Sequence, residues 1–105
     1  MKTLLLALAV VSITPSLLNL LPDARGCVGT LLVYAPAHPD NRVLRIQQND
    51  GTDAVDVSEA DLAGGRFSRE LHLRLGAGEF RTVTAWVIGP KTIRGSAVAR
   101  VQCLD

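Results

Sequence analysis

The strictest pattern in this chain lies near its end, where apolar and polar side chains alternate over residues 92–103. Successive side chains of a β-strand point to opposite faces, so this alternation predicts one buried face and one solvent-exposed face. A second run of this kind covers residues 81–88, and the Gly-Pro-Lys sequence between the two is typical of a turn. The two runs therefore predict a closing β-hairpin. The residues predicted to face the core in its second strand are Ile93, Ala97, Ala99, Val101 and Cys103.

The preceding part of the chain is divided by turn signals into further short strands. The predicted strands are residues 27–34, 42–48, 52–57 and 66–75. Asn-Asp-Gly at residues 49–51 favours a tight hairpin turn. Ser58 and Asp61 are spaced as a capping box, which predicts a single helical turn ended by two glycines. We therefore expect an all-β fold: a small antiparallel β-sandwich of five to seven short strands, immunoglobulin-like in general architecture.

The first residues have the layout of a secretory signal peptide. Lys2 precedes an uncharged apolar run over residues 3–13, and Pro15 interrupts the apolar character that continues to Leu21. Small residues stand three and one positions before Cys27, as a cleavage site there requires. The predicted domains are a signal peptide, 1–26, and a β-sandwich domain, 27–105. The alternative is that the apolar segment is retained as a membrane anchor.

Charge and composition exclude several kinds of partner. Removing 26 of the 105 residues leaves 79, with nine basic and nine acidic side chains and no formal net charge. No overall field then attracts nucleic acid or an anionic membrane, and the few aromatic residues do not form a stacking platform. We predict no nucleic-acid partner, and membrane contact only if Cys27 is lipidated.

The two cysteines, Cys27 and Cys103, lie at the two ends of the predicted domain. In an exported protein such a pair forms a disulfide, and closing a loop of roughly 77 residues stabilises a small domain by about 4–5 kcal/mol. The alternative is a lipid on Cys27, as in bacterial lipoproteins. Ala24 and Arg25 stand where that cleavage pattern has a Leu-like and a small neutral residue. The two alternatives exclude each other, because a thioether sulfur cannot form a disulfide.

The sequence contains no pattern of residues typical of a catalytic or metal site. Its two histidines, His38 and His72, are not spaced with cysteines or carboxylates as zinc ligands are. No serine lies in a nucleophile-elbow motif, and no glycine-rich run precedes a helical pattern. We therefore predict no catalytic residue, no metal ligand and no cofactor, and hence a protein that is not an enzyme.

Three segments together resemble those of a known family. They are Gly-Thr-Leu-Leu-Val-Tyr at residues 29–34, Val-Asp-Val-Ser-Glu-Ala-Asp at 55–61, and Phe-Ser at 67–68 before a hairpin that contains Trp86. In these segments the chain resembles small exported bacterial β-sandwich proteins of the pilotin type, which help a secretion-system secretin assemble in the outer membrane. The resemblance implies a periplasmic or outer-membrane-associated protein whose partner is a type III secretion secretin or another envelope protein.

The predicted function is therefore that of a non-catalytic, exported binding or assembly module, possible partners being a secretin or another secreted protein. A sandwich binds a partner by adding a strand at an open edge or by holding a helix in a groove. The last strand is predicted to be an edge guarded by outward charges, and its small inner residues leave room for a guest. The predicted partner-binding residues are Arg94, Ala97, Ala99 and Arg100. The alternative is a structural or adhesive immunoglobulin-like module of the surface or periplasm.

Overall fold

The computed structural model describes residues 10–105, in which every regular element is a β-strand. The predicted n-region around Lys2 lies outside the described residues. The strands are β1 (Ser12–Thr14), β2 (Leu17–Leu20), β3 (Cys27–Ala35), β4 (Val43–Asn49), β5 (Ala54–Asp61), β6 (Phe67–Leu75), β7 (Phe80–Ile88) and β8 (Ile93–Cys103).

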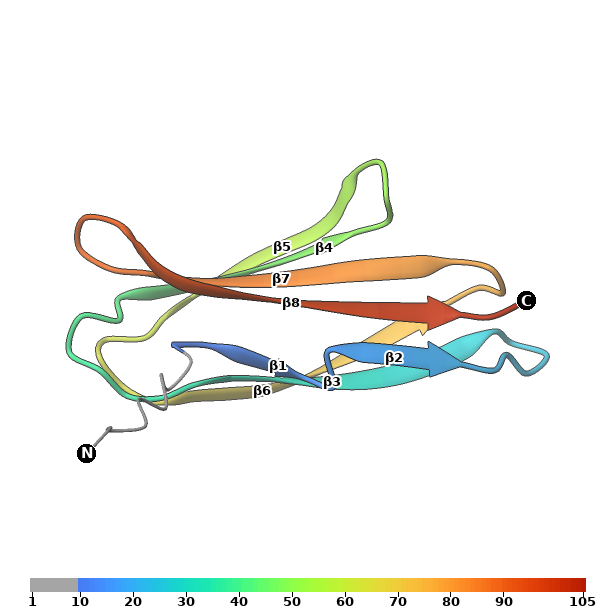
Figure 1. Cartoon of the computed structure of the whole chain (residues 1–105), viewed down its shortest axis with the longest axis horizontal. Coiled ribbons are helices and arrows are strands. Elements are labelled where there is room, and N and C mark those ends of the chain that lie inside the picture. The colour runs from blue at the N-terminus through green and yellow to red at the C-terminus, as the bar shows by residue number, and fades with distance from the viewer. Residues whose placement is uncertain (1–9) are drawn as a thin grey trace, which may run out of the picture.

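Two sheets face each other in a sandwich (Figure 1). One has the strand order β1-β3-β6 and the other the order β2-β8-β7-β4-β5. The chain crosses between the sheets after β1, β2, β3, β5 and β6, and it forms the hairpins β4–β5 and β7–β8 within one sheet. The predicted all-β sandwich of immunoglobulin-like general architecture is confirmed, and it has eight strands where five to seven were expected. All pairs are antiparallel except β2–β8, which is parallel.

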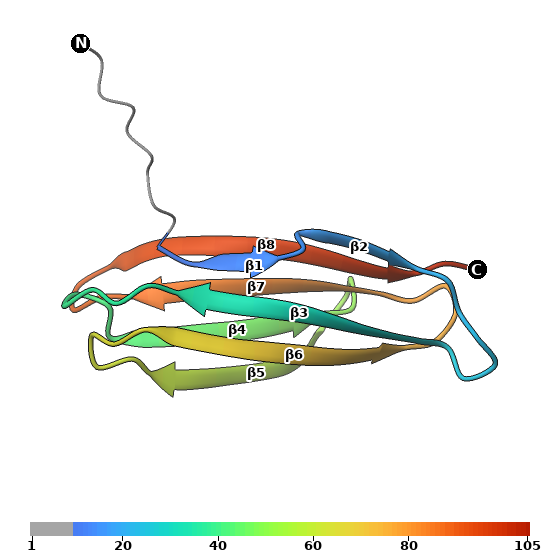
Figure 2. The ribbon, with the colours of Figure 1, turned by 90° about the horizontal axis from the view of Figure 1, so that it is seen from below.

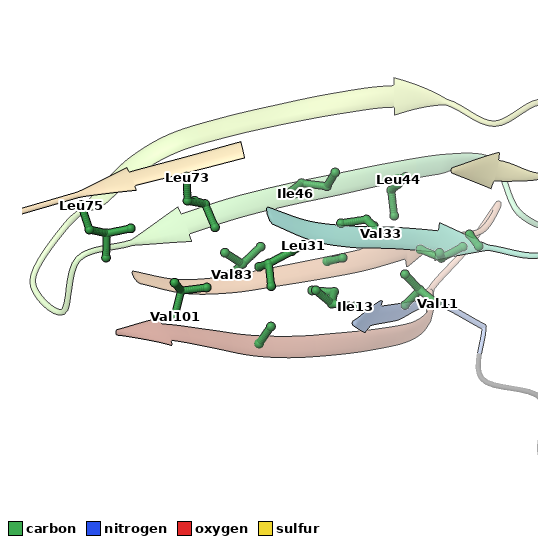
Figure 3. Close-up of a cluster of buried hydrophobic side chains, with 14 of the residues drawn as sticks. Val11, Ile13, Leu31, Val33, Leu44, Ile46, Leu73, Leu75, Val83 and Val101 are labelled. Atoms are coloured by element: carbon green, nitrogen blue, oxygen red, sulfur yellow. The ribbon is translucent and has the colours of Figure 1, made fainter. Parts of the chain in front are cut away.

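The core follows from the alternation that the sequence shows. In β7, Val83, Ala85 and Val87 are buried while their neighbours are not. In β3, Leu31 and Val33 are fully buried and meet the inner face of the opposite sheet (Figure 3). Burial of these aliphatic side chains is the main stabilising term, since each contributes about 1.5–3 kcal/mol. The two inner faces thus form one continuous apolar layer.

The predicted helical turn at residues 58–61 is wrong, because these residues belong to β5. Ser58 and Ala60 lie opposite Ile46 and Leu44 of β4 in an antiparallel register. One isolated helical turn fixes several dihedral angles for a single hydrogen bond. Pairing along the whole of β4 gives the same residues a full ladder instead, so the tertiary context overrides the local capping pattern.

The prediction that Ile93 faces the core is also wrong. The register of β7 with β8 shifts between Val87, which lies opposite Gly95, and Ile88, which lies opposite Ile93. An extra residue in one strand reverses the phase of the side chains beyond it. Ile93 is consequently 57% exposed, whereas Ala99, Val101 and Cys103 keep the predicted inward direction.

Part of the segment predicted as a signal peptide lies within the sandwich. β1 pairs with β3 and β2 pairs with β8, so the sandwich in the full chain extends upstream of the predicted boundary at Cys27. The predicted edge position of β8 holds only for its first part, because β2 covers Arg100 to Cys103. The described residues contain no helix that could cross a membrane. Cleavage before Cys27 and retention as an anchor both stay predictions.

Two adjacent leucines of β3 provide a test of which side chains face the core. Leu31 is fully buried, and Leu32 is 38% exposed on the opposite face. We expect Leu31→Ala to lower the free energy of unfolding by about 2–5 kcal/mol, because it leaves a cavity. Leu32→Ala should cost less than about 1 kcal/mol. Urea denaturation of both variants measures this, and equal losses would contradict the assigned faces.

Candidate functional site

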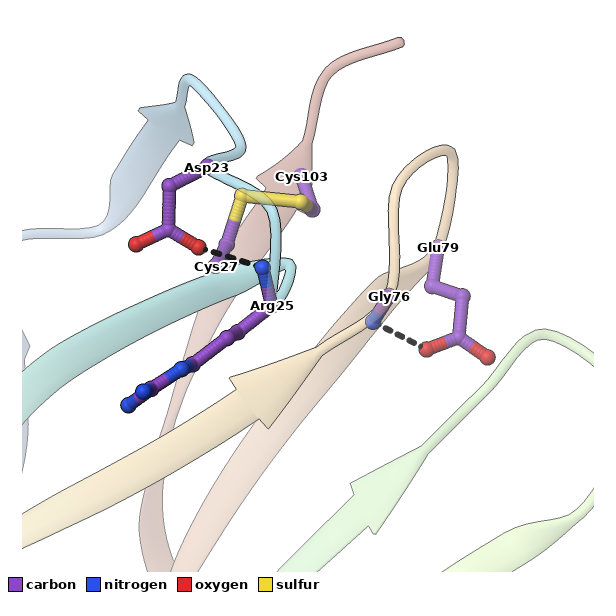
Figure 4. Close-up of a disulfide and its surroundings, with 6 residues drawn as sticks. All are labelled: Asp23, Arg25, Cys27, Gly76, Glu79 and Cys103. Carbon is purple, nitrogen blue, oxygen red and sulfur yellow. Dashed lines mark hydrogen bonds between the residues drawn. A yellow bond between two sulfur atoms is a disulfide. The ribbon is translucent and has the colours of Figure 1, made fainter.

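The disulfide joins the two sheets at one end of the sandwich (Figure 4). Cys27 begins β3 and Cys103 ends β8, and their Cα atoms are 5.7 Å apart. Both residues are buried. The predicted pairing of Cys27 with Cys103 is confirmed, and it is compatible with an extracellular or periplasmic location. In this structure the Cys27 sulfur is bonded to Cys103, so it is not the thioether that the lipidation alternative requires.

The cross-link should contribute a large share of the stability of a domain this small. A separation of 76 residues between the cysteines gives about 4–5 kcal/mol in the chain-entropy model. We expect the variant with both Cys27→Ala and Cys103→Ala to lose about 2–5 kcal/mol of unfolding free energy. Urea denaturation measures this loss, with the oxidised wild-type chain as reference. A loss below about 1 kcal/mol would contradict this assignment.

Arg94, a predicted partner-binding residue, is held by a loop of the protein itself. Its Nε donates to Oδ1 of Asn41 at 2.8 Å, and its Nη1 lies 3.7 Å from Oδ2 of Asp40. Asn41 is only 1% exposed, and its Nδ2 donates to the carbonyl of Pro36. Arg94 therefore supplies a partner to a buried polar group and connects β8 to the β3–β4 loop. A role in binding a partner protein stays a prediction for this residue.

The other predicted partner-binding residues lie on two different faces of β8. Arg100 is exposed, and its guanidinium carbon is 4.1 Å from the ring centroid of Phe80. Ala99 is buried, and Ala97 packs against the core from a partly buried position. The structure thus does not bring these residues together as one surface. The alanines contribute to the inner face of the sheet and Arg100 to its outer face.

The two arginines of β8 should differ in their effect on stability. Arg94→Ala leaves the buried amide oxygen of Asn41 without its charged donor, which should cost about 1–3 kcal/mol of unfolding free energy. Arg100→Ala removes one exposed cation–π contact and should cost at most about 1 kcal/mol. Thermal denaturation of the two variants compares them. Equal melting temperatures would contradict the structural role assigned to Arg94.

The face of the five-stranded sheet that points away from the core carries a separate apolar surface. At its centre lies Trp86 of β7, with Arg45 of β4 on one side and Ser96 of β8 on the other. A shallow hollow of about 380 Å³ opens here, lined by Trp86, Ile88, Ile93, Arg45 and Gln47. We call this region the Trp86 face. It combines an aromatic and aliphatic centre with polar groups at its margin, as protein interfaces do.

Exposed aliphatic and charged side chains extend the Trp86 face. Val98 is 56% exposed and lies beside Thr84, and Val57 is 46% exposed and lies beside Gln47. Arg45 and Glu59 form an exposed ion pair, 3.8 Å between Nη1 and Oε2. An exposed ion pair contributes little stability and leaves both groups available to a ligand. The face therefore offers apolar contact area with a donor and an acceptor beside it.

The sequence interpretation missed this face, although a signal for it exists. Val83, Ala85 and Val87 form the inward set of β7, which places Trp86 and Ile88 on the outward side. A tryptophan among the outward residues of a half-buried strand is a partly exposed large apolar group, and that is the informative exception to the usual burial pattern. The contribution of Ile93 could not be foreseen, because it depends on the shift of register in β8.

The ionisable groups considered for chemistry have local structural partners. Nδ1 of His38 accepts from the Asp40 amide at 3.1 Å, and Nδ1 of His72 lies 3.1 Å from the Thr30 hydroxyl. Backbone amides in the β4–β5 turn, that of Asp53 first, lower the pKa of Asp50 to about 2. Among residues 10–105, no three His, Cys, Asp or Glu side chains are grouped so that they could hold a metal ion.

In comparisons with known proteins, no family model, curated protein or solved structure matches this chain.

Proposed function

We propose that this protein is an exported, non-catalytic β-sandwich that binds another protein of the cell envelope. The observation that carries the proposal is the Trp86 face, where a partly exposed tryptophan, Ile88 and the exposed Ile93 line a shallow hollow. Tryptophan and arginine are the residue types that contribute most to binding energy in protein interfaces. A single exposed aliphatic side chain needs no explanation, but a group around the only tryptophan favours a contact surface.

The disulfide supports the proposed location. Disulfides persist in secreted and periplasmic proteins and are rare in the reducing cytosol. A bridge between the first residue of β3 and the last residue of β8 also suits a small domain that functions outside the cell, where it stabilises the fold against unfolding. The proposed location is the periplasm or the outer membrane.

The specific form of the proposal is a pilotin-like role in assembly of a secretin. Its support is the resemblance of residues 29–34, 55–61 and 67–68 to pilotin-type proteins. These segments form much of β3, most of β5 and the start of β6 in the folded chain. The partner in this role is a secretin, and the protein acts as its assembly chaperone.

The Trp86 face can be tested by capturing the partner from the parent organism. We expect the tagged full chain to recover an envelope protein, and a secretin in the pilotin-like role. Trp86→Ala should weaken this capture about 30-fold or more, because loss of a tryptophan anchor commonly costs at least about 2 kcal/mol of binding free energy. Quantitative mass spectrometry of the captured proteins measures the change.

The control is Val28→Ala, which removes a 62% exposed aliphatic side chain from the three-stranded sheet. This variant should capture the partner as the wild type does. The melting temperatures of both variants show whether they remain folded. Equal capture by Trp86→Ala and the wild type, or recovery of no envelope protein, would refute the proposal.

A second candidate is a structural or adhesive immunoglobulin-like module. The observation that favours it is that the described chain enters and leaves at opposite ends of the sandwich (Figure 1). Val10 lies against Gly95, near the β7–β8 turn, and Asp105 lies against Gly78 in the β6–β7 turn. This geometry permits modules to be joined end to end only if the residues before Cys27 are retained, because Cys27 is bonded to Cys103 at the same end as the C-terminus. Neighbouring genes for a secretion apparatus favour the assembly role, and those for long multidomain surface proteins favour the structural role.

A further inference from the structure

Residues 11–20 fill a groove that opens between an edge of each sheet. β1 lies beside β3 of the three-stranded sheet, and β2 lies beside β8 of the five-stranded sheet (Figure 2). The chain changes sheets between Thr14 and Leu17, so one segment closes both sheets on the same side of the sandwich. We call the space that this segment occupies the strand groove.

The side chains of the segment complete the core. Val11 is 3% exposed and Ile13 4% exposed, and both point into the layer between the sheets (Figure 3). Leu18 and Leu20 pack against the same core from partly buried positions. Without the segment, the apolar floor of the groove would face solvent.

The backbone of the segment pairs with the N–H and C=O groups along the outer edges of β3 and β8. Ser12 to Thr14 pair with Leu32 to Tyr34, and Leu17 to Leu20 pair with Arg100 to Cys103. The Arg100 amide donates to the Ser16 carbonyl at 2.9 Å, and the Leu104 amide donates to the Leu20 carbonyl at 2.8 Å. An edge that loses its neighbour presents a row of free N–H and C=O groups, which is a template for another strand.

Two glycines give the strand groove its shape. A Cβ atom at Gly29 would lie 2.9 Å from Cδ1 of Leu20 and 3.1 Å from Cδ2 of Leu18. A Cβ atom at Gly95 would lie 2.8 Å from Cβ of Val10. One strand from each sheet thus lacks a side chain where the segment lies closest. The walls of the groove are fitted to the side chains of an added strand.

We propose that the strand groove is an acceptor site for an extended segment of the partner protein, exposed when cleavage before Cys27 removes residues 1–26. This inference rests on the proposed function of protein binding and names a second binding surface for it. Residues 10–21, which occupy the groove in the full chain, carry no charge and define the chemistry of the partner segment. It is uncharged, extended and apolar at the positions of Val11, Ile13, Leu18 and Leu20. Backbone pairing would supply affinity, and these four side chains would supply specificity.

A cleavable form of the full chain tests the proposal. A specific protease site inserted after Leu21, which is 82% exposed, allows the segment to be cut after folding. We expect the cut protein to stay folded with the fragment bound non-covalently. A fluorescent peptide of residues 10–21 should then replace the fragment and bind saturably. The same peptide with Ile13→Asp and Leu18→Asp should bind at least about tenfold more weakly, which corresponds to about 1.4 kcal/mol.

Variants of the protein provide a second measurement. Gly29→Leu places a side chain where Leu18 and Leu20 lie, and it should weaken peptide binding at least tenfold. Val28→Leu changes the exposed neighbour and should leave binding unchanged. The proposal is overturned if the cut protein releases its fragment and takes up no peptide, or if the aspartate peptide binds as well as the native one.

A second copy of the chain is the competing occupant. It would appear as a concentration-dependent dimer of the cut protein that the peptide dissociates, and this result would overturn the assignment to a partner protein. The experiment does not involve Trp86. If the peptide does not bind the strand groove, the Trp86 face is still the proposed contact surface. If Trp86→Ala does not weaken capture of the partner, the peptide-binding result still stands.

Discussion

The contact between the inner faces of the two sheets is the interaction on which the rest of the structure depends. Leu31 and Val33 of β3 belong to one buried cluster with Val83 and Val101 of the opposite sheet, and the disulfide joins the two sheets at one end. A domain of this size buries a modest fraction of its surface, so a cross-link between the sheets contributes much of its margin of stability.

The fold could be predicted from the sequence because its strands alternate strictly. The inward sets of residues 66–75 and 81–88 and the pairing of the cysteines all follow from local pattern and position. Two errors arose where long-range pairing decides the outcome. Residues 58–61 pair with β4 instead of forming a helical turn, and the register shift in β8 turns Ile93 outward. Neither effect is visible in a short window of sequence.

The candidate site shows the same division between local and long-range effects. Outward exposure of Trp86 follows from the alternation within β7 alone, whereas the hollow beside it requires β4, β7 and β8 to lie in register. The role of Arg94 likewise depends on Asn41, which is 53 residues away in the sequence. An exposed arginine and an arginine bonded to a buried amide look identical in a sequence, so its structural role could not be inferred.

Residues 10–20 have a composition that suits two different environments. Uncharged aliphatic residues form the apolar region of a signal peptide, and the same residues alternate well enough to act as strands. In the full chain the strands bury Val11 and Ile13 and leave Leu17 60% exposed. Removing them would open two edges and part of the core together, and an added strand in the same place would cover both. In the proposed use of the groove, processing of the N-terminus and binding of a partner would therefore be coupled.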